Sequence, residues 1–534
     1  MTNSLLWTPL VFGLLGLFLP RRLSGWWATL GAAVTLALAI GALVGFDSGA
    51  AGLQDTVDVE WIPGLGVDYS LGIDGLNVFL ILLTAVLWVA GTAFAAFREQ
   101  ERPHLFFLMM LLGETATLGA FLAQDLLLFV LFFDLMLVPF YFLFGAWGSD
   151  REDGPTAAAA TLKMIVYTLV GSLLMLVAAI ATGILAADGG QITFSIADLA
   201  REPLGEGSQR WIFWFFAVAF LVKMPAFLLH GWMPDAYRAA PLPVLAVFSG
   251  VLAKVGAYGF LRVVLPLFPD ATVEFQEVVL VIALASILYG SVMAFTQTNV
   301  RLIAGYSSVA QLGFITAGIF ALSADGADGA VLQMVNHGLV VAPLLVIVAI
   351  LTERSGTEDL REMGGMAMRA PVLAALFLIV TLATLAMPGS ANFVGEFYIL
   401  NGLFDSKIVF ACVAIAGVAL SAYYALRLYQ RTMHNRKPEE IESREISLSD
   451  GVVLAPLVLC ILGLALYPQL ILKRTDVSVQ ASVAAVDGAS GGSPKTLNTR
   501  RDDHYREPST TLPRRSVSWE TPRTPRYDSW VADQ

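Results

Sequence analysis

Long apolar stretches constrain this chain more than any other feature. Fourteen of them follow one another along the 534 residues, and most approach the length of about 20 residues that a helix needs to cross a bilayer. Lipid offers an exposed backbone no hydrogen-bond partners, and the alternating pattern of barrel strands is absent, so these stretches must be helices. We predict an all-α polytopic membrane protein, with helices at residues 5–19, 25–45, 72–97, 104–122, 125–147, 161–186, 211–230, 241–266, 277–296, 301–321, 329–351, 371–402, 407–430 and 450–472.

The composition fits this class. Hydrophobic residues make up 57% of the chain and charged residues only 14%, which excludes a water-soluble surface. The net charge of −11 comes mainly from acidic residues in a few connecting loops, and we expect no nucleic-acid ligand. Cys412 and Cys460 lie in separate apolar stretches without a His or Cys partner at ligand spacing, so we expect both to pack and predict no metal or iron–sulfur site. The first stretch lacks a basic leader and a cleavage site, and is therefore interpreted as a retained helix.

Basic residues in the short connections predict the orientation. Loops after odd-numbered helices carry Arg21, Arg22, Arg98, Arg102, Arg151, Arg238, Arg301, Arg354, Arg361, Arg369, Arg431, Arg436, Lys437 and Arg444, whereas loops after even-numbered helices carry only Arg201, Arg210 and Lys407. The odd loops are therefore expected in the cytoplasm of a bacterial cell with this chain in its inner membrane. Both termini and the acidic segment 47–68 are expected on the outer, periplasmic side. We predict a transmembrane domain at residues 1–472 and a disordered polar tail at 473–534.

Five ionisable residues fall well inside predicted helices: Asp134, Lys223, Lys254, His337 and Glu396. Each would cost about 2.5–3.5 kcal/mol at the bilayer centre on insertion scales, so each needs a reason to be there. Static ion pairs between helices are one explanation, and a hydrogen-bonded core residue is another for His337. A series that crosses several helices favours a path for protons.

Other charged residues are weaker candidates. Glu114, in the fourth helix, is a further candidate for the same path. Asp125 and Lys163 lie near helix ends, from which a side chain can reach the interface. Arg262, near the outer end of the eighth helix, is interpreted as an interfacial anchor.

Two predicted helices contain breaks next to these charges. The seventh has Pro225 two residues after Lys223, and the twelfth has Pro388 and Gly389 shortly before Glu396. Proline removes a backbone donor and frees carbonyl groups that protein or water must satisfy. The breaks lie five helices apart, which predicts two inverted repeats, helices four to eight and nine to thirteen, with discontinuous helices seven and twelve.

A buried lysine beside a movable carboxylate can exchange protons. Burial disfavours the charged lysine, whereas a nearby carboxylate favours it, so moving the carboxylate switches proton affinity. We predict that Asp134 and Lys223 form this switch, that Lys254 receives the proton and that Glu396 passes it on.

Several segments match a known family. The stretches LLLFVLFFDLMLVPFYFLFGAWG, FLVKMPAFLLHGWMPDAYRAAP, SGVLAKVGAYGFLR, AGYSSVAQLGFI and MPGSANFVGEF, within residues 71–431, resemble the antiporter-like subunits of respiratory complex I, most of all those of the subunit M type of bacterial NADH–quinone oxidoreductase. The resemblance implies a fourteen-helix proton-pumping subunit without cofactors of its own, with NADH, FMN, iron–sulfur clusters and quinone bound by other subunits. It also implies sister antiporter-like subunits as partners. Lys223, Lys254 and Glu396 match the family's functional positions.

Two positions depart from the family pattern. Asp134 replaces the usual Glu and is shorter by one methylene, so its pair with Lys223 is expected to be looser. Gln311 replaces a common His and cannot hold a proton near neutral pH, so relay there would depend on water and His337.

Two alternatives stay open. One is a subunit of a multisubunit Na⁺/H⁺ antiporter or a membrane-bound hydrogenase, and the other is a membrane scaffold without transport. Glu396 favours the complex I subunit, because sister subunits and related antiporters usually carry Lys there. The set of buried charges argues against the scaffold.

Overall fold

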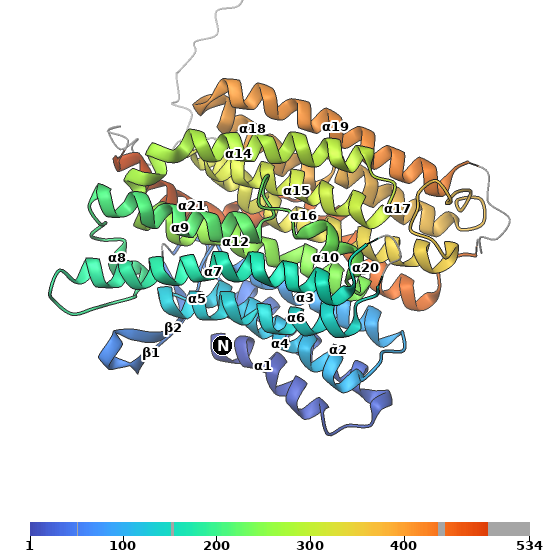
Figure 1. Cartoon of the computed structure of the whole chain (residues 1–534), viewed down its shortest axis with the longest axis horizontal. Helices are drawn as coiled ribbons and strands as arrows, with labels where there is room; N and C mark the ends of the chain where they lie inside the picture. Colours follow the sequence, from blue (N-terminus) through green and yellow to red (C-terminus); the bar gives the residue numbers. More distant parts are fainter. Residues whose placement is uncertain (51, 151–153, 436–443, 490–534) are drawn as a thin grey trace, which may run out of the picture. The chain divides into compact units, whose positions relative to one another are not determined.

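The computed structural model describes residues 1–50, 52–150, 154–435 and 444–489. Within these ranges the chain is a bundle of helices with one two-stranded antiparallel sheet (Figure 1). The predicted helical class is therefore confirmed, with a β-hairpin added. Arg151, Arg436, Lys437 and the part of the predicted tail from residue 490 onward lie outside the described residues.

The N-terminal part holds the hairpin, in the acidic segment that we expected as a loop. Its elements are α1 (Thr2–Gly16), α2 (Arg21–Gly45), β1 (Gln54–Ile62), β2 (Val67–Ile73) and α3 (Val78–Ala96). Val57 pairs with Leu71, and Val59 pairs with Tyr69 across the strands. Gly66 closes the turn with φ of 68°, a conformation that favours glycine.

The remaining elements form two successive groups and a C-terminal pair. The first group is α4 (Pro103–Leu122), α5 (Leu126–Leu135), α6 (Leu137–Trp147), α7 (Ala157–Ala187), α8 (Ile196–Leu199), α9 (Glu206–Lys223), α10 (Met233–Ala239), α11 (Leu242–Val247), α12 (Ala253–Gly259) and α13 (Leu265–Leu267). The second is α14 (Pro269–Thr296), α15 (Val300–Ile319), α16 (Ala324–Ser355), α17 (Pro371–Thr384), α18 (Ala391–Ser406) and α19 (Ile408–Met433), followed by α20 (Leu448–Leu466) and α21 (Gln469–Ala489). The predicted eighth helix runs continuously from α11 to α13 through two π-helical segments, Phe248–Leu252 and Phe260–Val264.

The membrane-spanning character is clear from length and composition. Eleven helices in the described ranges are long and apolar enough to cross a membrane. The other three predicted stretches correspond to α1, which is short, and to α9 and α17–α18, which are interrupted. The number fourteen therefore stays a prediction.

Both predicted breaks are present. α9 ends at Lys223 before Pro225, and six residues separate the end of α17 at Thr384 from the start of α18 at Ala391. The two broken helices begin at opposite ends of the bundle, as inverted repeats require (Figure 1). A third break, between α5 and α6 at Met136, was not predicted.

The bundle has two ends that differ in content. The hairpin, α8 and α21 lie together at one end, which we call the hairpin face (Figure 1). The opposite end, the arginine face, carries Arg98, Arg301, Arg354 and Arg361, and its ion pairs Arg98–Glu353 and Arg301–Glu358 are each 2.6 Å long.

Two corrections concern the C-terminal part and the cysteines. The predicted disordered tail from residue 473 is wrong over its first part, because α21 continues to Ala489 and buries Ile471, Val479 and Val483 against the bundle. The helix α21 packs against α13, α14 and α16, so this segment belongs to the folded bundle. Cys412 and Cys460 are free, as expected, but exposed rather than packed.

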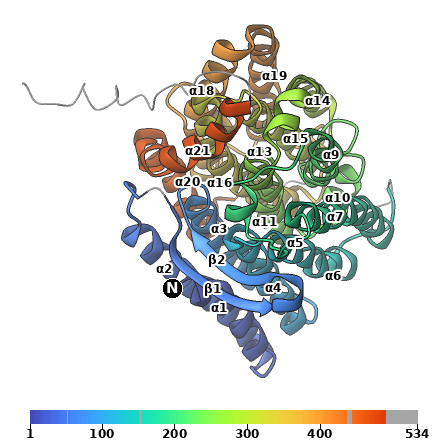
Figure 2. The same cartoon turned by 90° about the vertical axis from the view of Figure 1, so that its left-hand side faces the viewer.

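The interior of the bundle is formed by α15 and α16. All residues of their membrane-crossing windows are buried, whereas only 33% are buried for α2 and α19. Figure 2 shows α16 in the interior, close to α3, α11, α15 and α18. His337, on α16, therefore faces protein and not lipid.

Candidate functional site

Lys223 lies at the first helix break. It is the last residue of α9, where a cation is favoured by the helix dipole, and only 6% of it is exposed. Its Nζ lies 4.5 Å from the centre of the Phe133 ring and donates a long hydrogen bond of 3.5 Å to the Phe133 carbonyl. Trp232 donates to the Val222 carbonyl at 3.1 Å and so satisfies part of the backbone that the break frees.

Asp134 follows Phe133 and faces the same region. Its charge and that of Lys223 are close enough to interact, yet no direct ion pair joins them within the described ranges. Asp134 Oδ1 has no hydrogen-bond partner in the described part of the chain. The looser pair predicted from the shorter side chain is therefore what the structure contains.

A cavity connects Lys223 to a group of hydroxyls. Its volume is about 20 Å³, which gives room for about one water molecule. Lys223, Tyr237, Ser249 and Ser308 are among the residues that line it. Tyr237 donates to Ser249 Oγ at 2.9 Å, and Ser249 Oγ lies 3.4 Å from Ser308 Oγ.

Lys254 lies next to this cluster of three hydroxyls, on the side of Ser249. It is fully buried, and its Nζ donates to the Ser249 carbonyl at 2.8 Å. Ser249 belongs to the π-helical segment that precedes Lys254, a feature common at functional sites. Sequence reasoning missed Tyr237, Ser249 and Ser308, although all three lie within the segments on which the resemblance rests.

His337 on α16 comes next. It is 3% exposed, and Lys254 is near enough for its charge to act on the imidazole. Nδ1 of His337 makes no hydrogen bond with any described residue. The imidazole is thus buried beside a lysine, and its Nδ1 can take another partner.

Glu396 is held by one amide, which a second amide supports. Gln311 donates to Glu396 Oε1 at 2.8 Å, and Gln333 donates to Gln311 Oε1 at 2.7 Å. Gln333 lies one helical turn before His337 on α16, so the amides join the carboxylate to the helix that carries the histidine. Gln311 therefore orients Glu396 directly. The sequence showed only that Gln311 stands where many relatives have a histidine, and it did not predict this contact.

A second cavity is lined by Tyr424, whose side chain lies near Glu396. Its volume is about 10 Å³, and the polar residues lining it are Ser307, Thr381, Thr384 and Tyr424. The Tyr424 hydroxyl has no hydrogen-bond partner among the described residues and is close enough to Glu396 for their charges to interact. The cavity also contacts Ile303, two residues after Arg301, so it lies on the arginine-face side. An outward position of Glu396 stays a prediction.

Glu114 stands apart from the other candidates. It is fully buried on α4, and neither carboxylate oxygen has a hydrogen-bond partner in the part of the chain that the structure describes. Its participation in the path stays a prediction.

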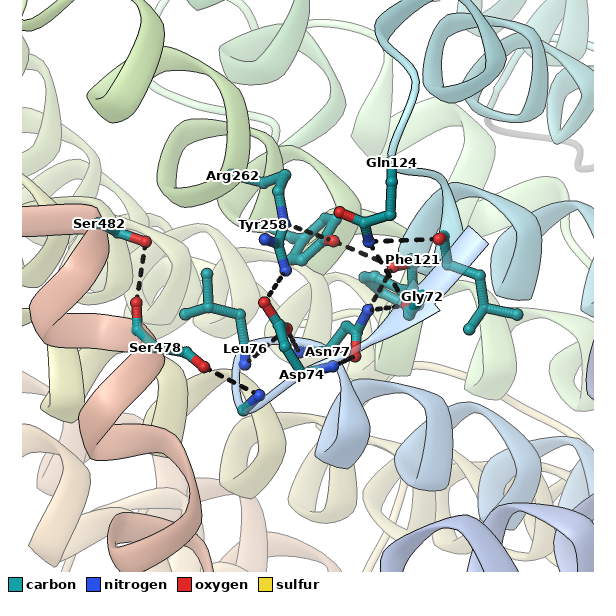
Figure 3. A network of polar contacts seen from close by, with 12 residues as sticks. Gly72, Asp74, Leu76, Asn77, Phe121, Gln124, Tyr258, Arg262, Ser478 and Ser482 are labelled. Carbon is teal, nitrogen blue, oxygen red and sulfur yellow. Dashed lines mark hydrogen bonds and ion pairs between the residues drawn. The ribbon is translucent and has the colours of Figure 1, made fainter. Parts of the chain in front are cut away.

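Three weaker candidates have other roles. Asp125 is not an interfacial residue: it is fully buried and caps α5, accepting from Leu128 N at 2.9 Å and Asp68 N at 3.1 Å. Lys163 is 43% exposed and pairs with Asp235 at 2.8 Å. The predicted role of Arg262 as an interfacial anchor is wrong, because its guanidinium is buried and pairs with Asp74 (Figure 3).

Comparison with known proteins places the fold in a family. Residues 123–421 match the family model described as NADH:quinone oxidoreductase/Mrp antiporter, TM. The chain belongs to this family. The matched segment of the NADH:quinone oxidoreductase/Mrp antiporter family contains all five principal candidates and leaves out Glu114.

Members of the family with similar sequences carry a specific name. NADH-quinone oxidoreductase subunit M of Escherichia coli (strain K12) is 37% identical over 433 residues, covering 80% of this chain and 84% of that protein. The subunit M of Rhodobacter capsulatus is 35% identical over 468 residues, covering 86% and 90%.

Solved structures agree. A chain of respiratory complex I from Thermus thermophilus with bound NADH is 30% identical, with a TM-score of 0.83, and the match covers 91% of this chain and all of that one. The Mrp complex from Dietzia sp. DQ12-45-1b matches with a TM-score of 0.78 at 21% identity, which supports the fold alone.

Proposed function

We propose that this chain is a proton-translocating membrane subunit of an NADH–quinone oxidoreductase, of the subunit M type. The observation that carries the proposal is a line of ionisable groups through the bundle: the half-buried Asp134 and the buried Lys223, Lys254, His337 and Glu396. The hydroxyls of Tyr237 and Ser249 lie between Lys223 and Lys254, which donates to the Ser249 carbonyl, and the Gln311 amide donates to Glu396. The relatives that match most of the chain bear the subunit M name, which favours this function over the antiporter alternative.

The first step is a switch between Asp134 and Lys223. The two side chains interact without contact, so a small approach of the carboxylate strengthens their attraction considerably in a medium of low dielectric constant. Approach favours the ammonium, and withdrawal favours release of its proton. The break after Lys223 allows this adjustment without bending a continuous helix.

The released proton passes through the hydroxyls of Tyr237 and Ser249 to Lys254. The cavity beside Lys223 has room for one water, and hydroxyls can both accept and donate. Tyr237 and Ser249 lead from the cavity to the π-helical segment whose carbonyl binds Lys254. His337 then links Lys254 to α16 and the Glu396 site.

Glu396 ends the line. Gln311 and Gln333 both donate in its direction, an arrangement that suits an ionised carboxylate. Protonation of Glu396 weakens the contact with Gln311 and frees the carboxyl group to turn. In this proposal quinone reduction and its cofactors belong to partner subunits, which drive the switch from outside the chain.

The orientation is part of the proposal. We infer that the arginine face is cytoplasmic and the hairpin face periplasmic in the inner membrane, because most basic residues of short loops lie on the arginine face. Single cysteines at Arg361 and Asp58, in a chain with Cys412→Ser and Cys460→Ser, test this. Position 58 should react with a membrane-impermeant thiol reagent in intact cells, and position 361 only in inverted vesicles.

The experiment for the function is Lys223→Ala in the assembled complex. NADH oxidation and proton uptake are measured together in inverted membrane vesicles, with Lys163→Ala as the matched control at an exposed lysine. We expect Lys223→Ala to lose most proton uptake per NADH and the control to keep it. Uptake at the wild-type ratio in an assembled Lys223→Ala complex would contradict the proposal.

A further inference from the structure

The interaction between Arg262 and Asp74 lies at the hairpin-face end of the helix that carries Lys254 (Figure 3). Arg262 donates one hydrogen bond to the Asp74 carboxylate and one, of 2.9 Å, from Nε to the Tyr258 hydroxyl. The side chains of Arg262 and Asp74 are 13% and 8% exposed. A guanidinium is thus almost buried and held by two hydrogen-bond partners where we expected an interfacial anchor.

Several separate segments hold this pair in place. Asp74 Oδ1 accepts from the backbone N–H groups of Leu76 and Asn77 at 3.0 and 3.2 Å. Asn77 in turn donates to the Phe121 carbonyl at 2.9 Å. Ser478 of α21 accepts from Gly75 N at 3.0 Å, so the C-terminal helix braces the same loop (Figure 3).

Lys254, Tyr258 and Arg262 follow one another at intervals of four residues. Side chains four apart lie on one face of a helix, about 6 Å apart along its axis. Tyr258 is fully buried between the two basic residues. Arg262 lies within the second π-helical segment, and its hydrogen bond to Tyr258 keeps the two side chains together there. A route from Lys254 along this face to the hairpin face therefore passes Tyr258 first and Arg262 next.

The hydrogen bonds around Tyr258 have a fixed direction. Its hydroxyl donates to the Phe121 carbonyl at 3.0 Å and accepts from Arg262. A guanidinium keeps its protons in proteins, so it cannot hand one to Tyr258. The carboxylate of Asp74 lies beyond the guanidinium, so a cation that approaches Lys254 from the hairpin face meets the positive charge of Arg262 between the carboxylate and the tyrosine.

We propose that the Arg262–Asp74 pair is a barrier that stops protons from returning to Lys254 from the hairpin face. The proposal rests on the proposed function, since it assumes that Lys254 carries protons. The Asp74 carboxylate offsets part of the guanidinium charge, but the guanidinium also contacts Tyr258 and the carboxylate does not, so a proton that passes Tyr258 meets the positive charge first. In a medium of low dielectric constant this charge repels it. A pump needs such a barrier, because an open path from its central lysine to the side of release would dissipate the gradient that it builds.

The test measures proton leak in the assembled complex. Two variants remove the positive charge: Arg262→Gln, which can still donate hydrogen bonds, and Arg262→Met combined with Asp74→Asn, which leaves no unpaired carboxylate. Each complex is placed in proteoliposomes, and the decay of an imposed pH gradient is recorded without NADH. We expect the gradient to decay several-fold faster in both variants than in the wild type.

Matched variants separate a barrier from a structural staple. Ser478→Ala removes a hydrogen bond from the same network without changing charge and is expected to hold the gradient as the wild type does. Lys254→Met added to each leaking variant should restore slow decay, because it interrupts the route behind the barrier. Slow decay in either charge-removing variant that assembles overturns the proposal, as does fast decay that persists with Lys254→Met. Neither result would affect the proposed function, which depends on the Lys223→Ala experiment.

Discussion

The two helix breaks create two sites with opposite designs. At the first break, Lys223 lies over an aromatic ring, beside a cavity and near a carboxylate that it does not contact. At the second break, Glu396 is held directly by an amide that is itself held by another amide. The first site keeps its charged partner at a distance, whereas the second fixes its carboxylate. We therefore expect the first site to switch the proton affinity of Lys223 and the second site to receive the proton.

The backbone carbonyls near the two breaks also have different hydrogen-bond donors. An indole N–H satisfies a carbonyl near the first, whereas at the second Asn336 donates to the Ala391 carbonyl at 2.7 Å. Asn336 precedes His337, so the second break is tied to the helix that carries the histidine. A change at α16 can therefore reach Glu396 through both Gln333 and Asn336.

The largest expected effect is at Glu396. Glu396→Gln is nearly isosteric and can still accept from Gln311, but it cannot ionise, so we expect proton uptake per NADH to fall severely in inverted vesicles while the complex assembles. Glu396→Lys should keep part of the uptake, because both amides can rotate to present oxygens to an ammonium. Full uptake by the Gln variant would mean that protons leave by another route.

Asp134 tests the switching site. Asp134→Asn removes the charge that acts on Lys223, and we expect a loss of uptake nearly as large. Asp134→Glu adds the methylene that the family usually has, brings the carboxylate closer to Lys223 and should be tolerated. The measurement is the proton-to-NADH ratio of both variants, and equal ratios for Asn and Glu would show that the carboxylate has no role in switching.

Prediction from the sequence succeeded where residues next to a feature cause it. Pro225 and Pro388 remove backbone donors, so the two breaks could be predicted, and the apolar stretches predicted the helices because lipid leaves the backbone no alternative. The hairpin was missed although Val57, Val59 and Trp61 alternate with polar residues, because its acidic composition suggested a loop. The break at Met136 was missed although Pro139 follows it closely. A proline there cannot donate to the carbonyl of Leu135, four residues earlier, where α5 ends.

The candidate site was predictable in its charges but not in its contacts. The partner of Arg262 lies 188 residues earlier in the chain, so its depth near a helix end suggested an interface instead. Gln311 meets Glu396 across 85 residues, and only packing of α15 against α18 brings them together. Tyr237, Ser249 and Ser308 carry no charge, and nothing in their local sequence distinguishes them from ordinary core hydroxyls.

Gln311 gives an intermediate effect that tests the receiving site. Gln311→Leu leaves Glu396 without its donor, and a hydrogen bond to a charged group contributes about 1.5–3 kcal/mol. If that energy supports the transfer step, uptake should fall by about tenfold or more. Gln311→His restores the family's usual residue and should stay close to the wild type. A wild-type ratio in the Leu variant would mean that the amide only fills space.

The smallest effect is expected at Tyr237, which belongs to the link between the two sites. Tyr237→Phe removes one hydroxyl from the route between Lys223 and Lys254 and leaves the ring in place. A neutral hydrogen bond contributes about 1 kcal/mol, so we expect the rate of uptake to fall by roughly fivefold, with assembly unchanged. Ser308→Ala is the companion variant, because Ser308 lies at the weaker, 3.4 Å contact and should matter less. The comparison depends on the order of the two effects: a larger loss in Ser308→Ala would mean that the proton passes through α15, and that Tyr237 only positions Ser249.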